Sequence, residues 1–121
     1  MLKRLFAALL VLAAPLVFAA DPQVIAVELD SYTIKPDVIT VKAGQPVTLK
    51  VTNKATFIPH NIVIKAPEAG IDIKLDVRAG KSGEVSFTAT KPGTYEIVCD
   101  KAPPIGKSHK EKGMHGKLIV E

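Results

Sequence analysis

The chain has 121 residues, with 16 Lys and Arg against 12 Asp and Glu and a formal net charge of +4. This mildly basic balance, with two tyrosines and four phenylalanines that fall mostly within apolar patterns, excludes the concentrated basic patch of a nucleic-acid-binding protein. The single cysteine excludes an internal disulfide. The length suits one domain with one core.

The first twenty residues are typical of a secretory leader. Lys3 and Arg4 precede an apolar run that ends in small residues, which is the layout of a signal peptide. Pro15 interrupts the run, which is short for a membrane span of about 20 residues, although an uncleaved anchor is the alternative. We expect cleavage after Ala19, with residues 1–19 as the signal peptide and residues 20–121 as a mature domain of net charge +2 without a transmembrane segment. Because a signal peptide directs export, we expect the mature domain to be periplasmic.

Past the leader, apolar residues recur at every second position, which predicts strands with one buried face each. In chain order the alternating sets are Ile25, Val27 and Leu29; Ile39 and Val41; Val47, Leu49 and Val51; His60, Ile62 and Ile64; Ile71, Ile73, Leu75 and Val77; Val85, Phe87 and Ala89; Tyr95, Ile97 and Cys99; and Leu118 and Val120. Turn-formers separate the sets, and residues 66–70 could carry a helical turn. About seven or eight short strands in one domain predict an all-β sandwich.

Four side chains with metal-binding chemistry fall at strand ends on the same side of this sandwich. His60 opens one strand, Cys99 closes another, and His109 and Met114 follow in the pattern Cys-x9-His-x4-Met. By strand parity His60, Cys99 and Met114 share the inward faces of their strands, whereas His115 points outward. A buried histidine without a partner is costly, and a metal would satisfy it.

Two imidazoles, one thiolate and one thioether suit copper in both of its oxidation states. Zinc is the main competitor, but a thioether is not among its usual ligands, so Met114 favours copper. The lone Cys99 supports the same interpretation, because an unpaired thiol in an oxidising compartment is a liability unless something occupies it. A buried, inert cysteine in a core without metal is the alternative.

Three segments resemble plastocyanin, pseudoazurin and their relatives, the cupredoxins. They are PGTYEIVCDKAPPIGKSHKEKGMHGKLIVE at residues 92–121, ITVKAGQPVTLKVTN at residues 39–53 and PHNIVI at residues 59–64. The resemblance implies a Greek-key sandwich with one type 1 blue-copper ion, whose equatorial ligands are His60, Cys99 and His109 and whose long axial ligand is Met114. It also implies that the Asn61 N–H donates to the cysteine sulfur while the Asn61 side chain ties the two ligand loops together. An ordinary polar strand residue is the alternative for Asn61.

The nine-residue segment between Cys99 and His109 departs from the family pattern. It is longer than the loops of plastocyanin, azurin or pseudoazurin and resembles more closely the electron-accepting site of the copper nitrite reductases. A longer loop could tilt the ligands, so colour and potential are not carried over. The nitrite reductases also need a second copper site built from further histidines, which a chain with three histidines lacks.

These patterns predict a monomeric, exported carrier of one electron between redox partner proteins, and not an enzyme, because the site offers no open position for a substrate. Lysines crowd the copper end, and a positive rim would attract an acidic docking surface, although solubility is the alternative reason for them. Periplasmic copper buffering, resistance or delivery is the second hypothesis, which the extra His115 and the long loop leave open. The lysines concerned are Lys101, Lys107, Lys110, Lys112 and Lys117.

Overall fold

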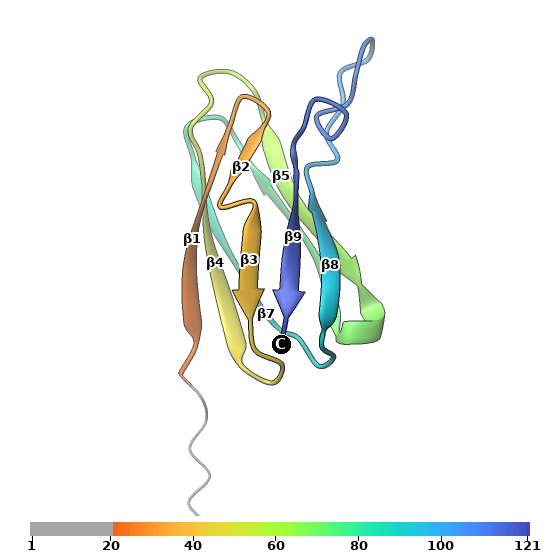
Figure 1. Ribbon diagram of the computed structural model, residues 1–121. Coiled ribbons are helices and arrows are strands. Elements are labelled where there is room, and N and C mark those ends of the chain that lie inside the picture. Colours follow the sequence, from red (N-terminus) through yellow and green to blue (C-terminus); the bar gives the residue numbers. More distant parts are fainter. Residues whose placement is uncertain (1–20) are drawn as a thin grey trace, which may run out of the picture.

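The computed structural model describes residues 21–121, so the signal peptide and cleavage site predicted at residues 1–19 lie outside the described residues. In the described part, nine strands form two facing sheets, which is the all-β sandwich that the sequence predicts (Figure 1). No helix between residues 21 and 121 is long and apolar enough to cross a membrane.

The first sheet has four strands in the order β2-β1-β4-β7, and the second has five in the order β3-β9-β8-β5-β6. Strands β1 and β4 are parallel, as are β3 and β9, while the other neighbours are antiparallel. The elements are β1 Gln23–Asp30, β2 Thr33–Lys35, β3 Val38–Val41, β4 Pro46–Asn53, β5 His60–Ala66, the 3-10 turn η1 Pro67–Ala69, β6 Ile71–Val77, β7 Ser82–Thr88, β8 Gly93–Val98 and β9 His115–Val120.

The strand count exceeds the predicted seven or eight because a short segment after β1 also pairs. Strand β2 runs antiparallel to the end of β1 across a turn at Ser31 and Tyr32. It contributes a single inward residue, Ile34, so its sequence shows no alternation that could be detected. The helical turn considered for residues 66–70 is present as η1.

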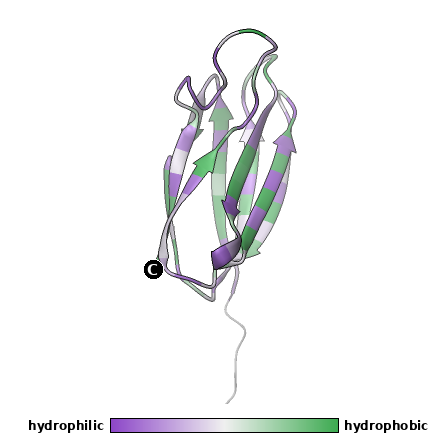
Figure 2. Cartoon of the chain, turned by 90° about the vertical axis from the view of Figure 1, so that its right-hand side faces the viewer, coloured by the Kyte–Doolittle hydropathy of each residue, from purple (hydrophilic) through white to green (hydrophobic). Residues whose placement is uncertain are grey.

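Alternating residues fill the space between the sheets as predicted. On β4, Val47, Leu49 and Val51 are buried, while Lys50 between them is exposed. Figure 2 shows hydrophobic and hydrophilic residues alternating along the strands in the same way. Strand β5 differs, because both of its faces are buried from His60 to Ile64. His60, the first residue of β5, is therefore fully buried.

Gly116 lets the start of β9 pass close to the segment between β2 and β3. A Cβ on Gly116 would clash with the main-chain oxygen of Asp37, which also accepts a 2.7 Å hydrogen bond from the N–H of Lys117. We expect Gly116→Ala to lower the free energy of unfolding by about 1–3 kcal/mol, because backbone cannot move aside as a side chain can. Thermal unfolding of the variant would measure this loss.

Gly83→Ala in β7 is the matched control for that measurement. Its added methyl group would lie 3.3 Å from the end of the Leu75 side chain, and a side chain can change rotamer more easily than the backbone can move. We therefore expect a smaller change in melting temperature than for Gly116→Ala. Equal melting temperatures for the two variants would contradict the role of Gly116.

Candidate metal centre

The four predicted ligands lie together at one end of the sandwich, the upper end in Figure 1. His60 is the first residue of β5, Cys99 directly follows β8, and Met114 directly precedes β9, while His109 belongs to the connection between β8 and β9. These three strands are neighbours in the second sheet. His60, Cys99 and Met114 are fully buried and His115 is exposed, as strand parity predicts.

Three donor atoms form a triangle at this end, which we call the donor triangle. The Nδ1 atoms of His60 and His109 are 3.2 Å apart, and the Sγ of Cys99 lies 3.4 Å from Nδ1 of His109 and 3.9 Å from Nδ1 of His60. The centre of such a triangle is about 2 Å from each corner, which is close to the length of metal–imidazole and metal–thiolate bonds. Within residues 21–121, this is the one group of His, Cys, Asp and Glu side chains that could hold a metal ion together.

The connection between Cys99 and Met114 is tied at its base despite its length. The N–H of His109 donates to the carbonyl of Lys101 at 2.9 Å, and the N–H of Met114 donates to the carbonyl of His109 at 3.0 Å. The N–H of Cys99 in turn donates to the carbonyl of Met114 at 3.1 Å. Residues 102–108 project outside these bonds, so the extra length does not separate the segments that carry the donors.

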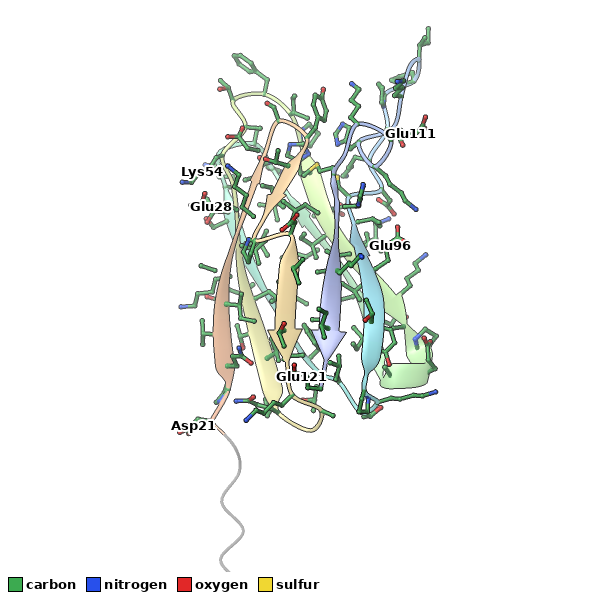
Figure 3. All side chains as sticks on the ribbon, in the orientation of Figure 1. Asp21, Glu28, Lys54, Glu96, Glu111 and Glu121 are labelled. Carbon is green, nitrogen blue, oxygen red and sulfur yellow. The ribbon has the colours of Figure 1, made fainter. Side chains whose placement is uncertain are left out.

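A local motif sets the direction of the turn that carries His109. The N–H of Glu111 donates to Oγ of Ser108 at 3.2 Å, and the Glu111 carboxylate accepts from the N–H of Ser108 at 3.3 Å. This reciprocal pair is a capping box, which typically begins a helical turn. The turn ends at Gly113, whose φ of 104° is a conformation that glycine tolerates. Figure 3 shows Glu111 in this connection at the upper end of the molecule.

Met114 brings a thioether into the same buried region. Its side chain is fully buried and belongs to the same hydrophobic cluster as Cys99. The neighbouring His115 instead lines a surface pocket of about 440 Å³ together with Lys110 and Lys117. The backbone of Met114 is hydrogen-bonded to those of Cys99 and His109, so its buried thioether is available as a fourth donor. The His115 imidazole faces outward instead.

Asn61 joins the two segments that carry His60 and Cys99. Its N–H points at Sγ of Cys99 at 3.4 Å. Its side-chain amide donates to Oδ1 of Asp100 at 2.7 Å and accepts from the N–H of Asp100 at 3.0 Å. The hydrogen bond from Asn61 lowers the pKa of Asp100. Asn61 thus makes the contacts that the resemblance implies and is not an ordinary polar strand residue.

Tyr32 and Asp76 also border the site, although the sequence pattern does not indicate that they lie there. Asp76 accepts a 3.4 Å hydrogen bond from the amide of Asn61. The ring of Tyr32 packs against both imidazoles, with centroid separations of 6.4 Å to His60 and 5.3 Å to His109. These contacts join distant parts of the chain, so no spacing between neighbouring residues could indicate them.

Burial favours the neutral form of each donor. Burial lowers the pKa of His60, and the nearby His109 lowers it further. Burial also lowers the pKa of His109, and the positive charges of Lys112 and Lys101 act in the same direction. Burial raises the pKa of the Cys99 thiol. Neutral imidazoles can bind a metal directly, whereas binding at Cys99 must release the thiol proton.

A surface pocket of about 320 Å³ leads to the edge of His109. Of the four predicted ligands, His109 alone has an exposed fraction above zero, at 6%. One wall comes from the loop between β4 and β5 and the other from the start of the long connection, and the lining residues are Tyr32, Phe57, Ile58, Pro59, Lys101, Ala102, Pro103, His109 and Lys112. The His109 imidazole is therefore the part of the donor triangle nearest to solvent.

The donor set fits one type 1 copper ion. Two imidazole nitrogens and one sulfur in a plane, with a weak thioether on the axis, are the donors of such centres. In the described part of the chain the fully buried Cys99 is the single thiol, so a zinc site of the paired-cysteine kind would lack its second thiolate.

A family model described as a cupredoxin-like domain matches residues 3–120 of the chain. A solved auracyanin from Roseiflexus castenholzii is 25% identical with a TM-score of 0.67, over 84% of this chain and 98% of that one. Auracyanin A of Chloroflexus aurantiacus, described as a "blue" copper protein, is 25% identical with a TM-score of 0.65, over 84% and 100%. The metal-binding domain of the Streptococcus pneumoniae D39 Cu(I)-exporting P-type ATPase CopA is 16% identical with a TM-score of 0.63, over 83% and 86%, and shares the fold alone. No curated protein matches the sequence.

Proposed function

The chain belongs to the cupredoxin-like family, and we propose that it is an exported one-electron carrier with a single type 1 copper ion. The observation that carries the proposal is the donor triangle of His60, Cys99 and His109, whose sides of 3.2, 3.4 and 3.9 Å match a trigonal metal site. We assign these three residues as equatorial ligands and the buried Met114 as the axial ligand. The two auracyanins, one of them described as a "blue" copper protein, support this assignment.

The donors are held by the fold itself, which suits electron transfer better than catalysis. Sheet pairing and the hydrogen bonds among Cys99, His109 and Met114 fix the backbone around the site. A copper ion would supply the one-electron redox chemistry, and a soft donor set serves both of its oxidation states. Four protein donors leave no open position for a substrate, whereas catalytic metal sites keep one.

Copper titration and voltammetry together test the proposal. We expect saturation at one copper per chain and a reversible one-electron wave, with the ion retained over repeated cycles. Periplasmic copper buffering or delivery is the second candidate, which the exposed His115 and the long connection leave open. Rapid transfer of Cu(I) to a chelator, with loss of the wave on cycling, would favour copper handling over electron transfer.

The periplasmic location is a separate part of the proposal, and it rests on the leader at residues 1–19. We expect the exported protein to begin at Ala20. N-terminal sequencing of periplasmic protein would check the cleavage site, and recovery of the full chain in the membrane fraction would instead support an uncleaved anchor.

The lysine-rich end is proposed to receive an acidic redox partner. Lys101 pairs with Asp76 at 3.1 Å and Lys110 with Glu96 at 2.7 Å, Glu96 being labelled in Figure 3. No carboxylate in residues 21–121 lies within ion-pair distance of Lys107. The same holds for Lys112 and Lys117, so three of the five lysines at this end have no ion-pair partner within these residues, and a monomer would leave the whole end accessible to the partner.

Reversing the charge at this end should slow oxidation of the reduced protein by an anionic oxidant such as ferricyanide. We expect Lys107→Glu combined with Lys110→Glu to lower the rate by about threefold or more at low salt, because like charges reduce the encounter rate. The difference should shrink above 0.1 M salt, where the Debye length falls below about 10 Å. Stopped-flow kinetics at several ionic strengths would measure it.

Lys42→Glu combined with Lys91→Glu is the matched control, since it changes the net charge equally. Both lysines are exposed in turns at the opposite end of the sandwich. We expect a much smaller decrease in rate. Equal decreases in the two double variants would mean that net charge, and not a docking end, governs the encounter.

A further inference from the structure

Tyr32, in the turn between β1 and β2, lies across both histidines of the donor triangle. Its ring meets that of His109 at 5.3 Å between centroids and an interplanar angle of 69°, and that of His60 at 6.4 Å and 80°. The two imidazoles are themselves 5.0 Å apart at 70°. Edge-to-face pairs at roughly 4.5–7 Å are attractive and directional. Each of the three rings therefore restricts rotation of the other two.

The backbone of Tyr32 is strained. Its φ of 66° is the one positive φ of a non-glycine residue within residues 21–121. A Cβ makes this left-handed region unfavourable, and bulky residues rarely occupy it. Such a conformation persists only where surrounding contacts outweigh it, and it often marks a functional site. Here the ring contacts that accompany the strain lie at the metal centre.

Lys112 ties the Tyr32 ring to the segment that carries two of the assigned ligands. Its Nζ lies 4.3 Å from the centroid of the ring and donates to Oη of Tyr32 at 3.2 Å. A cation over an aromatic face is attracted by the electrons of the ring. The N–H of Lys112 also donates to the carbonyl of His109 at 3.1 Å. The β1–β2 turn and the turn between His109 and Met114 are thereby joined through one side chain.

We infer that Tyr32 is a positioning residue that holds the imidazoles of His60 and His109 in the orientation that binds copper. The ring acts without touching the metal, by blocking rotation of His109 toward the solvent-facing pocket that both residues line. This inference rests on the proposed copper function. Its consequence is that copper retention depends on an aromatic ring at position 32 more than on the overall stability of the fold.

The test compares three substitutions by Cu(I) release to the chelator bicinchoninate, with Cu(II) electron paramagnetic resonance as a second readout. Tyr32→Leu removes the ring, and we expect Cu(I) release at least about tenfold faster, within the range for lost supporting residues at metal sites. Tyr32→Phe keeps the ring and loses only the Oη contact, so we expect release within about twofold of the wild-type rate and a similar spectrum.

Tyr32→Gly separates positioning from folding. Glycine tolerates the positive φ, so we expect the metal-free protein to melt close to the wild-type temperature while Cu(I) release is still accelerated. Tyr95→Phe is the matched control, because Tyr95 is the other tyrosine of the chain and donates to the carbonyl of Lys91 at the opposite end. We expect it to leave release and spectrum unchanged.

Tyr95→Phe also provides a direct probe, because the chain has no Trp and Tyr32 then remains the sole tyrosine. We expect added copper to quench its fluorescence in this background. Wild-type release rates and spectra in both Tyr32→Gly and Tyr32→Leu would overturn the inference while leaving the copper function intact. Failure of the wild-type protein to bind copper would instead overturn the proposed function and the inference together.

Discussion

Cys99→Ser is expected to abolish the intense visible absorption of the oxidised, copper-loaded protein. The absorption arises from charge transfer from a thiolate to Cu(II), and Cys99 supplies the one sulfur of the donor triangle and the only thiol of the chain. A serine hydroxyl is neither ionised nor polarizable in this way, so copper would be held mainly by the two imidazoles. Absorption spectra of both proteins at equal copper content would measure the loss.

His115→Ala is the control for the colour, because it removes an imidazole from the outer face of β9 and should leave the absorption unchanged. A wild-type protein that stays colourless when it is loaded with copper and oxidised would contradict the ligand assignment. Displacement of copper by zinc, with loss of any visible absorption band, would contradict it as well.

The metal centre could be predicted because the residue types indicate its chemistry, and the alternation of inward and outward residues along each strand indicates where the donors lie. Cys99 and Met114 fall in phase with the inward residues of their strands, and period-two alternation along β8 and β9 makes that phase visible. The histidine at the start of β5 is in phase in the same manner. What parity specifies is which face a donor occupies, and the pairing of β5, β8 and β9 then brings the faces together.

The parts that could not be predicted depend on contacts between distant segments. Strand β2 is defined by its pairing with β1, and a single inward residue, Ile34, gives no periodicity. Tyr32 stands in a turn whose sequence does not show that the ring reaches His109, 77 residues later. The hydrogen bond between His109 and Lys101 likewise keeps the donors close together although the connection is long, and the length of the loop does not predict this bond.

Met114→Gln should lower the reduction potential of the copper centre while leaving copper bound by His60, Cys99 and His109. A thioether binds Cu(I) well and Cu(II) weakly, whereas the harder amide oxygen of glutamine favours Cu(II). Each tenfold change in the relative affinity for the two oxidation states shifts a one-electron potential by about 59 mV, so a shift on the order of 100 mV is expected. Voltammetry and electron paramagnetic resonance of the variant would measure the change.

His115→Ala provides the decisive comparison, because His115 is next to Met114 in the sequence and its imidazole is also a possible copper ligand. Met114 is fully buried, while His115 is exposed on the outer face of β9 beside Lys117. An axial imidazole would favour Cu(II), so loss of a true His115 ligand would raise the potential and alter the spectrum. We expect neither change. A large shift in His115→Ala, with Met114→Gln nearly silent, would reverse the assignment and contradict the inward position of Met114 at the start of β9.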